Sequence, residues 1–437
     1  MAFDAGKYAL QNWRIYRTQL EMIRRPEDAA TLQKRRDGFL AQVRKYAPHW
    51  EQECLDIDRI FGVAPGSSMD ALCFGCPVPQ TSHECTSWIV MPEFTGGKQL
   101  HLHKNRDANS RHLTVLQVAV PGKHAWTGMG NTGSLTPTMG VNDAGLAIAM
   151  NSGEKTADFN EGGFSTPALA RILLEECRTA EDAVQLLETM ILDKAYRHGD
   201  RGSIWFIADG SGAFIAEHNA AAFAAHPVDG IGVRANFWHY SEMRPHSTED
   251  PAERLRQRSR ENTAYKILLD EGLLTRQIIT AADHRKASRS SEVYGDSRAL
   301  CSYTTNSASL FSIDCEFPGE LTTAWLACGP PRRALYIPIP VAVSNLPQEL
   351  LNGELADAFF ANAGEYTGKD PARLNTRDVP TDELEKTESI LEKNHTLAVE
   401  NARAFLKDGR NTEAAAVLEE AFRRNWALVK TFALPGK

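Results

Sequence analysis

The residues best suited to chemistry begin at Glu84. Cys85 is followed by two small hydroxyl residues, Thr86 and Ser87, at the start of a β-rich run, and a polar cluster at Asn105–Asp107 closes the next expected strand. In this arrangement a cysteine can be released by self-cleavage of the bond before it. It then becomes an N-terminal nucleophile whose general base is its own backbone amine. The chemistry would be amide hydrolysis or acyl transfer.

A free α-amine suits this task because its pKa, roughly 7.7–8.0, lies close to that of a cysteine thiol, about 8.5. The amine can take the thiol proton near neutral pH and return it to a leaving amine. Asp107 could hold that amine. Asn151 and Asn236 both end apolar stretches and could donate hydrogen bonds to the oxyanion.

The same region also fits a structural zinc site. Zinc prefers thiolate and imidazole ligands, and four of these lie within a short segment: Cys73, Cys76, His83 and Cys85. One Cys-x-x-Cys pair without a second is weak support, and Pro77 and Pro79 restrict how the segment could wrap an ion. A buried cysteine with no special role is a further alternative. His101 and His103 share one face of a strand, where half-exposed histidines are the default expectation.

Composition excludes several classes. The chain has 437 residues, 42% of them hydrophobic and 24% charged, which is typical of a soluble globular protein. A formal net charge of −8 without a basic block argues against a nucleic-acid partner. No stretch suggests a signal peptide or a membrane span. Eight thinly spread cysteines then favour free thiols and a cytoplasmic protein.

The expected elements change in kind along the chain. Residues 1 to about 62 have helical periodicity, with Pro48 in the first turn of one helix and Gly62 just after its end. Strands are then expected at 87–91, 99–103, 113–120, 145–151, 203–208, 213–218, 231–236, 309–315, 322–328 and 334–339. Helices are expected at 166–177, 180–190 and within 252–284.

This order is not the strict alternation of a doubly wound parallel sheet. It favours an α+β fold in which antiparallel sheets pack face to face with helices outside. The run Gly128–Gly133 is expected to be a glycine-rich turn and not a phosphate-binding loop. Two amphipathic helices, at about 382–407 and 412–430, should dock on the core or on a sister subunit.

Several motifs, in their order and spacing over residues 40–340, resemble the acyl-coenzyme A:6-aminopenicillanic acid acyltransferase family of N-terminal-nucleophile hydrolases. Its relatives include penicillin V acylase, bile salt hydrolase and secernin-like dipeptidases. The matching motifs are Glu84-Cys85-Thr86-Ser87, Asn105-Arg106-Asp107, the turn Met139–Leu146 with Asn142, the helix Phe164–Cys177, Arg234-Ala235-Asn236, Ala308–Ile313 and Cys328–Pro331.

The resemblance implies a four-layer αββα sandwich and cleavage between Glu84 and Cys85. Residues 1–84 would form a helical pro-segment that stays associated as a small chain, 85–345 the catalytic core, and 346–437 a helical extension. Catalysis would pass through a thioester on Cys85, without metal or cofactor, with Asp107, Asn151 and Asn236 in the roles above.

The sequence departs from the family pattern in places. Glu84 stands where many relatives have glycine, and Asn306 where relatives often have an arginine, with Arg298 the nearest substitute. Lys104 occupies a position that is arginine in the bile salt hydrolase branch, and Arg106 is a second candidate for favouring the thiolate.

The expected substrate is a small N-acyl amide, with acyl-coenzyme A a possible acyl source and a homo-oligomer a possible assembly. Two alternatives stay open. One is a dipeptidase of the secernin-like branch. The other is a protein without this activity, either a zinc-binding protein or an uncut, inactive relative.

Overall fold

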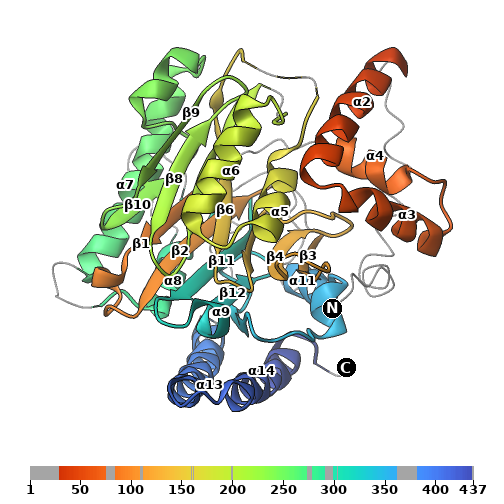
Figure 1. The fold of residues 1–437 in the computed structure, drawn as a ribbon. Helices are drawn as coiled ribbons and strands as arrows, with labels where there is room; N and C mark the ends of the chain where they lie inside the picture. Colours follow the sequence, from red (N-terminus) through yellow and green to blue (C-terminus); the bar gives the residue numbers. More distant parts are fainter. Residues whose placement is uncertain are drawn as a thin grey trace.

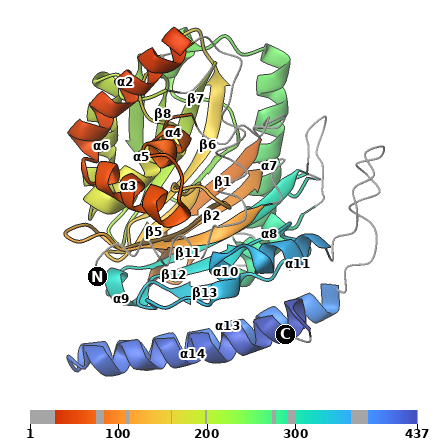
Figure 2. The same ribbon diagram turned by 90° about the vertical axis from the view of Figure 1, so that its right-hand side faces the viewer.

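The computed structural model describes residues 29–74, 84–108, 112–158, 160, 162–197, 200–272, 278–290, 299–302, 304–361 and 381–435. Two antiparallel sheets lie face to face, and helices cover the outer side of each sheet (Figures 1 and 2). The layer order is therefore αββα, and the expected α+β fold is confirmed. Within the described residues, no helix has the length and apolar character that crossing a membrane requires.

The first sheet holds the expected nucleophile. Its six strands have the order β10-β1-β2-β11-β12-β13. Their bounds are β1 Cys85–Val90, β2 Gln99–Asp107, β10 Ile231–Arg234, β11 Thr305–Asp314, β12 Thr323–Ala327 and β13 Ile337–Pro340.

The second sheet has seven strands in sequence order, β3 to β9. Their bounds are β3 Leu113–Val118, β4 Trp126–Asn131, β5 Met139–Asn142, β6 Ala147–Lys155, β7 Arg201–Ala208, β8 Ala213–His218 and β9 Phe223–Pro227. Because each strand pairs with its neighbour in the chain, short connections suffice for most of this sheet.

Three apolar clusters separate the layers. Leu102, Ile204 and Leu310 belong to the core between the two sheets. A second core joins the outer face of the second sheet to α5 Thr166–Glu176 and α6 Ala180–Leu192. A third joins the first sheet to α7 Pro251–Gly272 and α8 Ala281–Ser288.

Three N-terminal helices pack beside α5. They are α2 Ala29–Tyr46, α3 His49–Phe61 and α4 Ser67–Phe74. Helix α3 ends as expected, because Gly62 adopts a left-handed conformation with φ of 64°. Its apolar residues Trp50, Cys54 and Ile57 enter the same core as α5, so this part of the chain is integral to the fold.

The C-terminal helices lie along β13 (Figure 2). They are α13 Thr381–Lys407 and α14 Asn411–Ala433, and they follow the short helices α10 Gln348–Leu351 and α11 Glu354–Ala361. Leu391, Phe422 and Trp426 join the core between the sheets, so of the two expected docking sites these helices use the core. Three further short helices are η1 Pro92–Phe94, η2 Ser241–His246 and α9 Pro318–Leu321.

The expectation of a turn at Gly128–Gly133 was wrong for most of that run. Its first four residues belong to strand β4, which pairs with β3 and β5. A Cβ atom on Gly128 would lie 2.5 Å from the carbonyl oxygen of Met139. Glycine is needed here for close approach of the backbones, and not for a reversal of the chain. In addition, no strand was predicted at β5 or β9, and no helix was predicted at α4.

Candidate active site

Strand alternation along β2 explains where the chemical residues point. Successive residues of a strand face opposite sides of its sheet. Leu100 and Leu102 face the second sheet and belong to the core between the sheets. Lys104 continues this face, because its Nζ donates to Asn151 Oδ1 on β6 at 2.9 Å. Arg106, two residues further, completes it.

The odd-numbered residues of β2 face the helical layer instead. His101 Nδ1 lies 2.9 Å from His284 Nε2 on α8. Asn105 Nδ2 donates to the carbonyl oxygen of Ser288 at 2.9 Å. His101 and His103 share a face, as the sequence predicts, but both are buried and not half-exposed.

Cys85 lies on the face of β1 that looks toward the second sheet. It pairs with Arg106 in the β1–β2 register. Ser87, on the same face, donates to Asn151 Oδ1 at 2.8 Å, and Ile89 enters the core between the sheets. The Cys85 side chain is therefore placed at the end of this interface, next to Lys104 and Arg106.

Both sides of the bond between Glu84 and Cys85 are held by hydrogen bonds. The carbonyl oxygen of Glu84 accepts from the backbone N–H of Asp107 at 3.0 Å. The backbone N–H of Cys85 donates to Asn236 Oδ1 at 2.7 Å. The carbonyl oxygen of Cys85 accepts from Arg260 Nη1 at 3.3 Å. The peptide group is thus fixed in one orientation beside the thiol.

Asp107 is fully buried and paired. Its carboxylate accepts from Arg260 Nη2 at 2.8 Å and from the Thr305 hydroxyl. Burial raises the pKa of Asp107, while the Arg260 guanidinium counteracts that rise. The arginine therefore opposes protonation of the carboxyl group at the position where the sequence predicts a partner for the Cys85 amine.

Lys104 is a buried cation next to the nucleophile. Burial lowers the pKa of Lys104, and the neighbouring Cys85 thiol partly opposes this by favouring the charged ammonium. Its hydrogen bonds go to Asn151 Oδ1 and to the carbonyl oxygen of Met150. Lys104 and Cys85 line the same pocket, so the ammonium lies near the thiol.

The two asparagines differ in their free donors. Asn151 Nδ2 donates to the carbonyl oxygens of Arg234 and Ala235, at 3.1 and 3.0 Å, so both of its amide hydrogens are used. Asn236 Nδ2 donates to the carbonyl oxygen of Ser152 at 2.7 Å, which leaves its second hydrogen. In this arrangement Asn151 orients Lys104 and Ser87, and Asn236 keeps one amide hydrogen for another acceptor.

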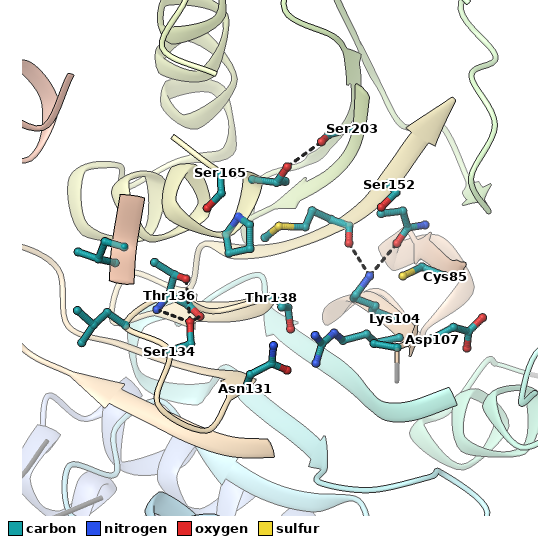
Figure 3. Close-up of a pocket in the computed structure, with 18 of the residues that line it drawn as sticks. Cys85, Lys104, Asp107, Asn131, Ser134, Thr136, Thr138, Ser152, Ser165 and Ser203 are labelled. Carbon is teal, nitrogen blue, oxygen red and sulfur yellow. Dashed lines mark hydrogen bonds between the residues drawn. The ribbon is translucent and has the colours of Figure 1, made fainter. Parts of the chain in front are cut away.

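A pocket of about 290 Å³ opens beside these residues (Figure 3). Cys85, Lys104, Arg106, Asp107 and Asn151 line one side of it. The rest of the wall is rich in hydroxyl groups, with a few apolar side chains: Ser134, Thr136, Thr138, Ser152, Ser165, Thr166, Ser203, Leu72, Leu135 and Met150. Such a cavity suits a small molecule with both polar and apolar parts.

Helix α7 contributes two residues to the site that no sequence motif indicated. Arg260 contacts Asp107 and Cys85, as described above. Glu261 accepts the backbone N–H of Ala235 at 2.8 Å and so fixes the loop that carries Asn236. The sequence offered little signal, because Arg260 is one of four arginines within seven residues of one charged helix, at 254, 256, 258 and 260.

Other candidates lie elsewhere. Asn142 is outside the pocket, where its Nδ2 donates to the carbonyl oxygens of Leu174 and Cys177 and fixes the end of α5. Arg298 falls outside the described residues, as do Cys76 and His83 of the alternative zinc site. No group of three or more metal-ligating side chains occurs in the part of the chain that the structure describes.

Solved structures of three hydrolases are similar to this chain over about half of its length. An N-acylethanolamine-hydrolyzing acid amidase ortholog from Caenorhabditis elegans is similar at 13% identity and a TM-score of 0.37, over 54% of this chain and 93% of that one. Penicillin V acylase from Agrobacterium tumefaciens is similar at 14% identity and a TM-score of 0.32, over 56% and 86%.

A variant of conjugated bile acid hydrolase from Clostridium perfringens is similar at 13% identity and a TM-score of 0.35, over 55% of this chain and 88% of that one. Among curated proteins, no sequence matches the chain.

A family model matches residues 94–223, a range that contains Lys104, Asp107 and Asn151 but neither Cys85 nor Asn236. The enzyme class expected from the motifs, an amide hydrolase or acyltransferase, agrees with this match. Over residues 94–223 the chain carries the pattern of the acyl-coenzyme A:6-aminopenicillanic acid acyl-transferase family, which confirms the resemblance stated from its motifs.

Proposed function

We propose that this chain is an autoprocessing enzyme in which Cys85, freed at its amine, hydrolyses or transfers the acyl group of an N-acyl amide. One observation supports this most strongly. The backbone nitrogen that would become the amine already donates to Asn236 Oδ1 at 2.7 Å, and the Cys85 thiol on the same residue lines the pocket beside Lys104. The proposed nucleophile and the proposed base therefore both belong to Cys85, and both lie beside the pocket that would bind the substrate.

In the cleavage step, Cys85 Sγ attacks the carbonyl carbon of Glu84. The bond between that carbon and the Cys85 nitrogen breaks, the nitrogen takes the thiol proton, and a thioester forms. Water then hydrolyses the thioester to give a Glu84 carboxylate and a free thiol. The Asp107 N–H already donates to the Glu84 carbonyl oxygen, so it would stabilise the negative charge that develops there.

In turnover, the free amine of Cys85 takes the thiol proton as sulfur attacks the substrate carbonyl. The proton passes to the leaving amine, and the acyl group remains on sulfur as a thioester. Water, or an acceptor amine, then releases the acyl group. Asp107 and Asn236 Oδ1 would hold the amine, while the second Asn236 hydrogen stabilises the oxyanion. The Lys104 ammonium would lie near the reacting sulfur.

After cleavage, residues 1–84 would stay bound as a small chain. Arg171 on α5 makes two hydrogen bonds to Glu53 on α3, at 2.8 and 2.5 Å, and a third to Glu175 at 2.8 Å. Glu175 also contacts His49 at 2.9 Å and Trp50 at 3.2 Å. All of these groups but His49 are fully or almost fully buried, so separating the two chains would expose unpaired charges.

The small chain would also contribute to the active site. Ala71 and Leu72 on α4 line the pocket that contains Cys85. Loss of residues 1–84 would therefore remove one wall of the pocket, and the mature enzyme is expected to be a complex of both chains.

The proposal is tested by turnover and by trapping of the acyl-enzyme. Purified protein is assayed against a panel of penicillins, bile-salt conjugates, acyl amino acids, β-alanyl amines and dipeptides. We expect hydrolysis of at least one amide, and a mass increase equal to the acyl group on the fragment that begins at Cys85. Cys85→Ala should show neither, whereas Cys315→Ser, a substitution outside the pocket, should show both.

Two results would favour the alternatives. Stoichiometric zinc that is lost in Cys73→Ser would support a zinc-binding protein. An uncut chain without zinc and without turnover of any amide in the panel would support an inactive relative.

A further inference from the structure

The Arg106 side chain has no partner that explains its burial. It is 5% exposed, and its Nη1 makes no hydrogen bond with any described residue. A buried cation without a counter-ion is costly, so such groups are ordinarily paired. Its neighbour on the same face, Lys104, donates to two oxygen acceptors, whereas Arg106 Nη1 has none among the described residues.

The charges around Arg106 leave it free to attract an anion. Asp107 is the only acidic residue among the described residues that line the pocket, and Arg260 and Thr305 already occupy its carboxylate. Two cations, Lys104 and Arg106, therefore face the cavity, and the one carboxylate among its described lining residues is already paired. Burial lowers the pKa of Arg106, and the neighbouring Cys85 opposes this only in part.

A second unsatisfied atom lines the same pocket. Asn131 Oδ1 is buried without a hydrogen-bond partner among the described residues. Figure 3 shows Asn131 on the far side of the cavity from Cys85, beyond Lys104. A carboxamide can turn to present its N–H₂ instead, so Asn131 can either donate to an anion or accept from an amide N–H.

We propose that Arg106 is the receptor for a carboxylate of the substrate, and that the enzyme acts on small amides that carry a free carboxylate, such as N-acyl amino acids. This inference rests on the proposed function for the identity of the reacting amide. A guanidinium presents two parallel N–H donors that match a carboxylate, and a buried pair of this kind is strong. The volume of about 290 Å³ fits a compact molecule, and the hydroxyl groups of the wall could bind its polar atoms.

Arg106 is thus assigned to binding and specificity. A guanidinium that served only the Cys85 thiolate would act on all substrates alike. A carboxylate receptor instead changes the ratio between an acid and its neutral analogue, and that ratio is the measurable signature.

The binding test uses the full chain with Cys85→Ala, which cannot turn over substrate. Calorimetry compares N-benzoylglycine with N-benzoylglycinamide, which replaces the carboxylate by a neutral carboxamide. We expect the acid to bind about 10- to 100-fold more tightly, because a charge-assisted hydrogen bond pair is lost in the amide. Adding Arg106→Leu should remove this preference, Arg106→Lys should retain part of it, and the exposed Arg258→Leu should leave it intact.

The kinetic test uses the active enzyme and measures release of glycine or glycinamide from the same two compounds. Arg106→Leu should reduce kcat/KM for the acid about 10- to 100-fold more than for the amide. Equal losses on both compounds, or equal binding of both by the unsubstituted pocket, would overturn the assignment. Asn131→Ala serves as a second variant should Arg106→Leu fail to fold, and it should reduce the same ratio in the same direction.

The two proposals fail separately. A chain that cuts itself and hydrolyses acid and amide equally well keeps the proposed function and loses the carboxylate site. A chain that hydrolyses nothing but binds the acid through Arg106 loses the proposed function and keeps the site.

Discussion

The two faces of strand β2 differ in how their buried polar residues are paired. On the helical side, His101, His103 and Asn105 each have a hydrogen-bond partner from another element, although His103 Nδ1 has none among the described residues. On the side of the second sheet, Lys104 donates hydrogen bonds to a backbone oxygen and to an asparagine oxygen. Arg106 Nη1 has no hydrogen-bond partner among the described residues.

This difference distinguishes residues that stabilise the fold from residues that are available to bind a ligand. Satisfied polar groups rigidify a fold, because each has a fixed partner in a medium of low dielectric. Unsatisfied ones beside a cavity are available to a ligand. One strand therefore has a structural face and a reactive face, and substitutions on the two faces should have different effects.

The largest effect is expected at the end of the strand, where Asp107 lines the pocket and pairs with Arg260. Arg260→Met leaves the Asp107 carboxylate buried without its ion-pair partner, which should reduce the free energy of unfolding by about 3–5 kcal/mol. The measurement is urea unfolding with Cys85→Ala present in every variant, so that all chains are single and uncut. Combining it with Asp107→Asn should recover part of the loss, and the exposed Arg258→Met on the same helix should cost little. A small effect of Arg260→Met would mean that water replaces the arginine.

On the reactive side, Asn236→Ala should reduce kcat about 10²- to 10³-fold, equivalent to ~2.7–4 kcal/mol of transition-state stabilisation, because it removes the proposed oxyanion donor. Steady-state kinetics on a substrate identified from the panel would measure this. Asn345→Ala, at an exposed asparagine, is the matched control. If Asn236→Ala keeps full activity while Asn151→Ala loses it, the two asparagines have exchanged roles in the cut enzyme.

The structural face should also make the protein sensitive to acid. Burial lowers the pKa of His101 to about 4 and lowers the pKa values of His103 and His284 as well. Their unfolded forms bind protons below about pH 6.5, but the folded forms do not, so stability should fall as pH decreases from 6.5 toward 4. His101 alone would account for about 3 kcal/mol.

Unfolding in urea at pH 7 and at pH 5 would measure this slope. His101→Gln should flatten it, whereas the exposed His112→Gln should not. An unchanged slope in His101→Gln would show that other groups govern acid sensitivity.

The smallest effect is expected from Tyr336→Phe. The Tyr336 hydroxyl donates to Ser288 Oγ at 2.6 Å and lies 3.1 Å from His103 Nε2. Its loss should reduce the free energy of unfolding by about 1–2 kcal/mol. Because these contacts belong to the structural face, kcat/KM should change by less than about threefold, a shift below roughly 1 kcal/mol. A larger loss of activity would show that the two faces are coupled.

Local pattern was enough to predict one part of the site. The strand periods at 87–91 and 99–103 imply a hairpin, and this hairpin places Cys85 opposite Arg106 and close to Lys104 and Asp107. Alternation could further have shown that Lys104 and Arg106 continue the apolar face of Leu100 and Leu102, which is an unusual place for two cations.

The rest depended on packing between distant segments. Asn236 reaches Cys85 from 151 residues away, and Arg260 does so because α7 lies over the first sheet. Nothing in the sequence distinguishes Arg260 from Arg258, although one is buried and the other exposed. The state of Asn151, with both amide hydrogens used, is set by the loop at Arg234–Ala235 and has no local signature.

The central claim is that Cys85 becomes the first residue of a separate chain, and intact-mass analysis of the purified protein under denaturing conditions tests it most directly. We expect the masses of two fragments, residues 1–84 and 85–437, for the native sequence and the mass of a single chain for Cys85→Ala. An uncut native chain that hydrolyses amides, or a large fragment that begins at any other residue, would contradict it.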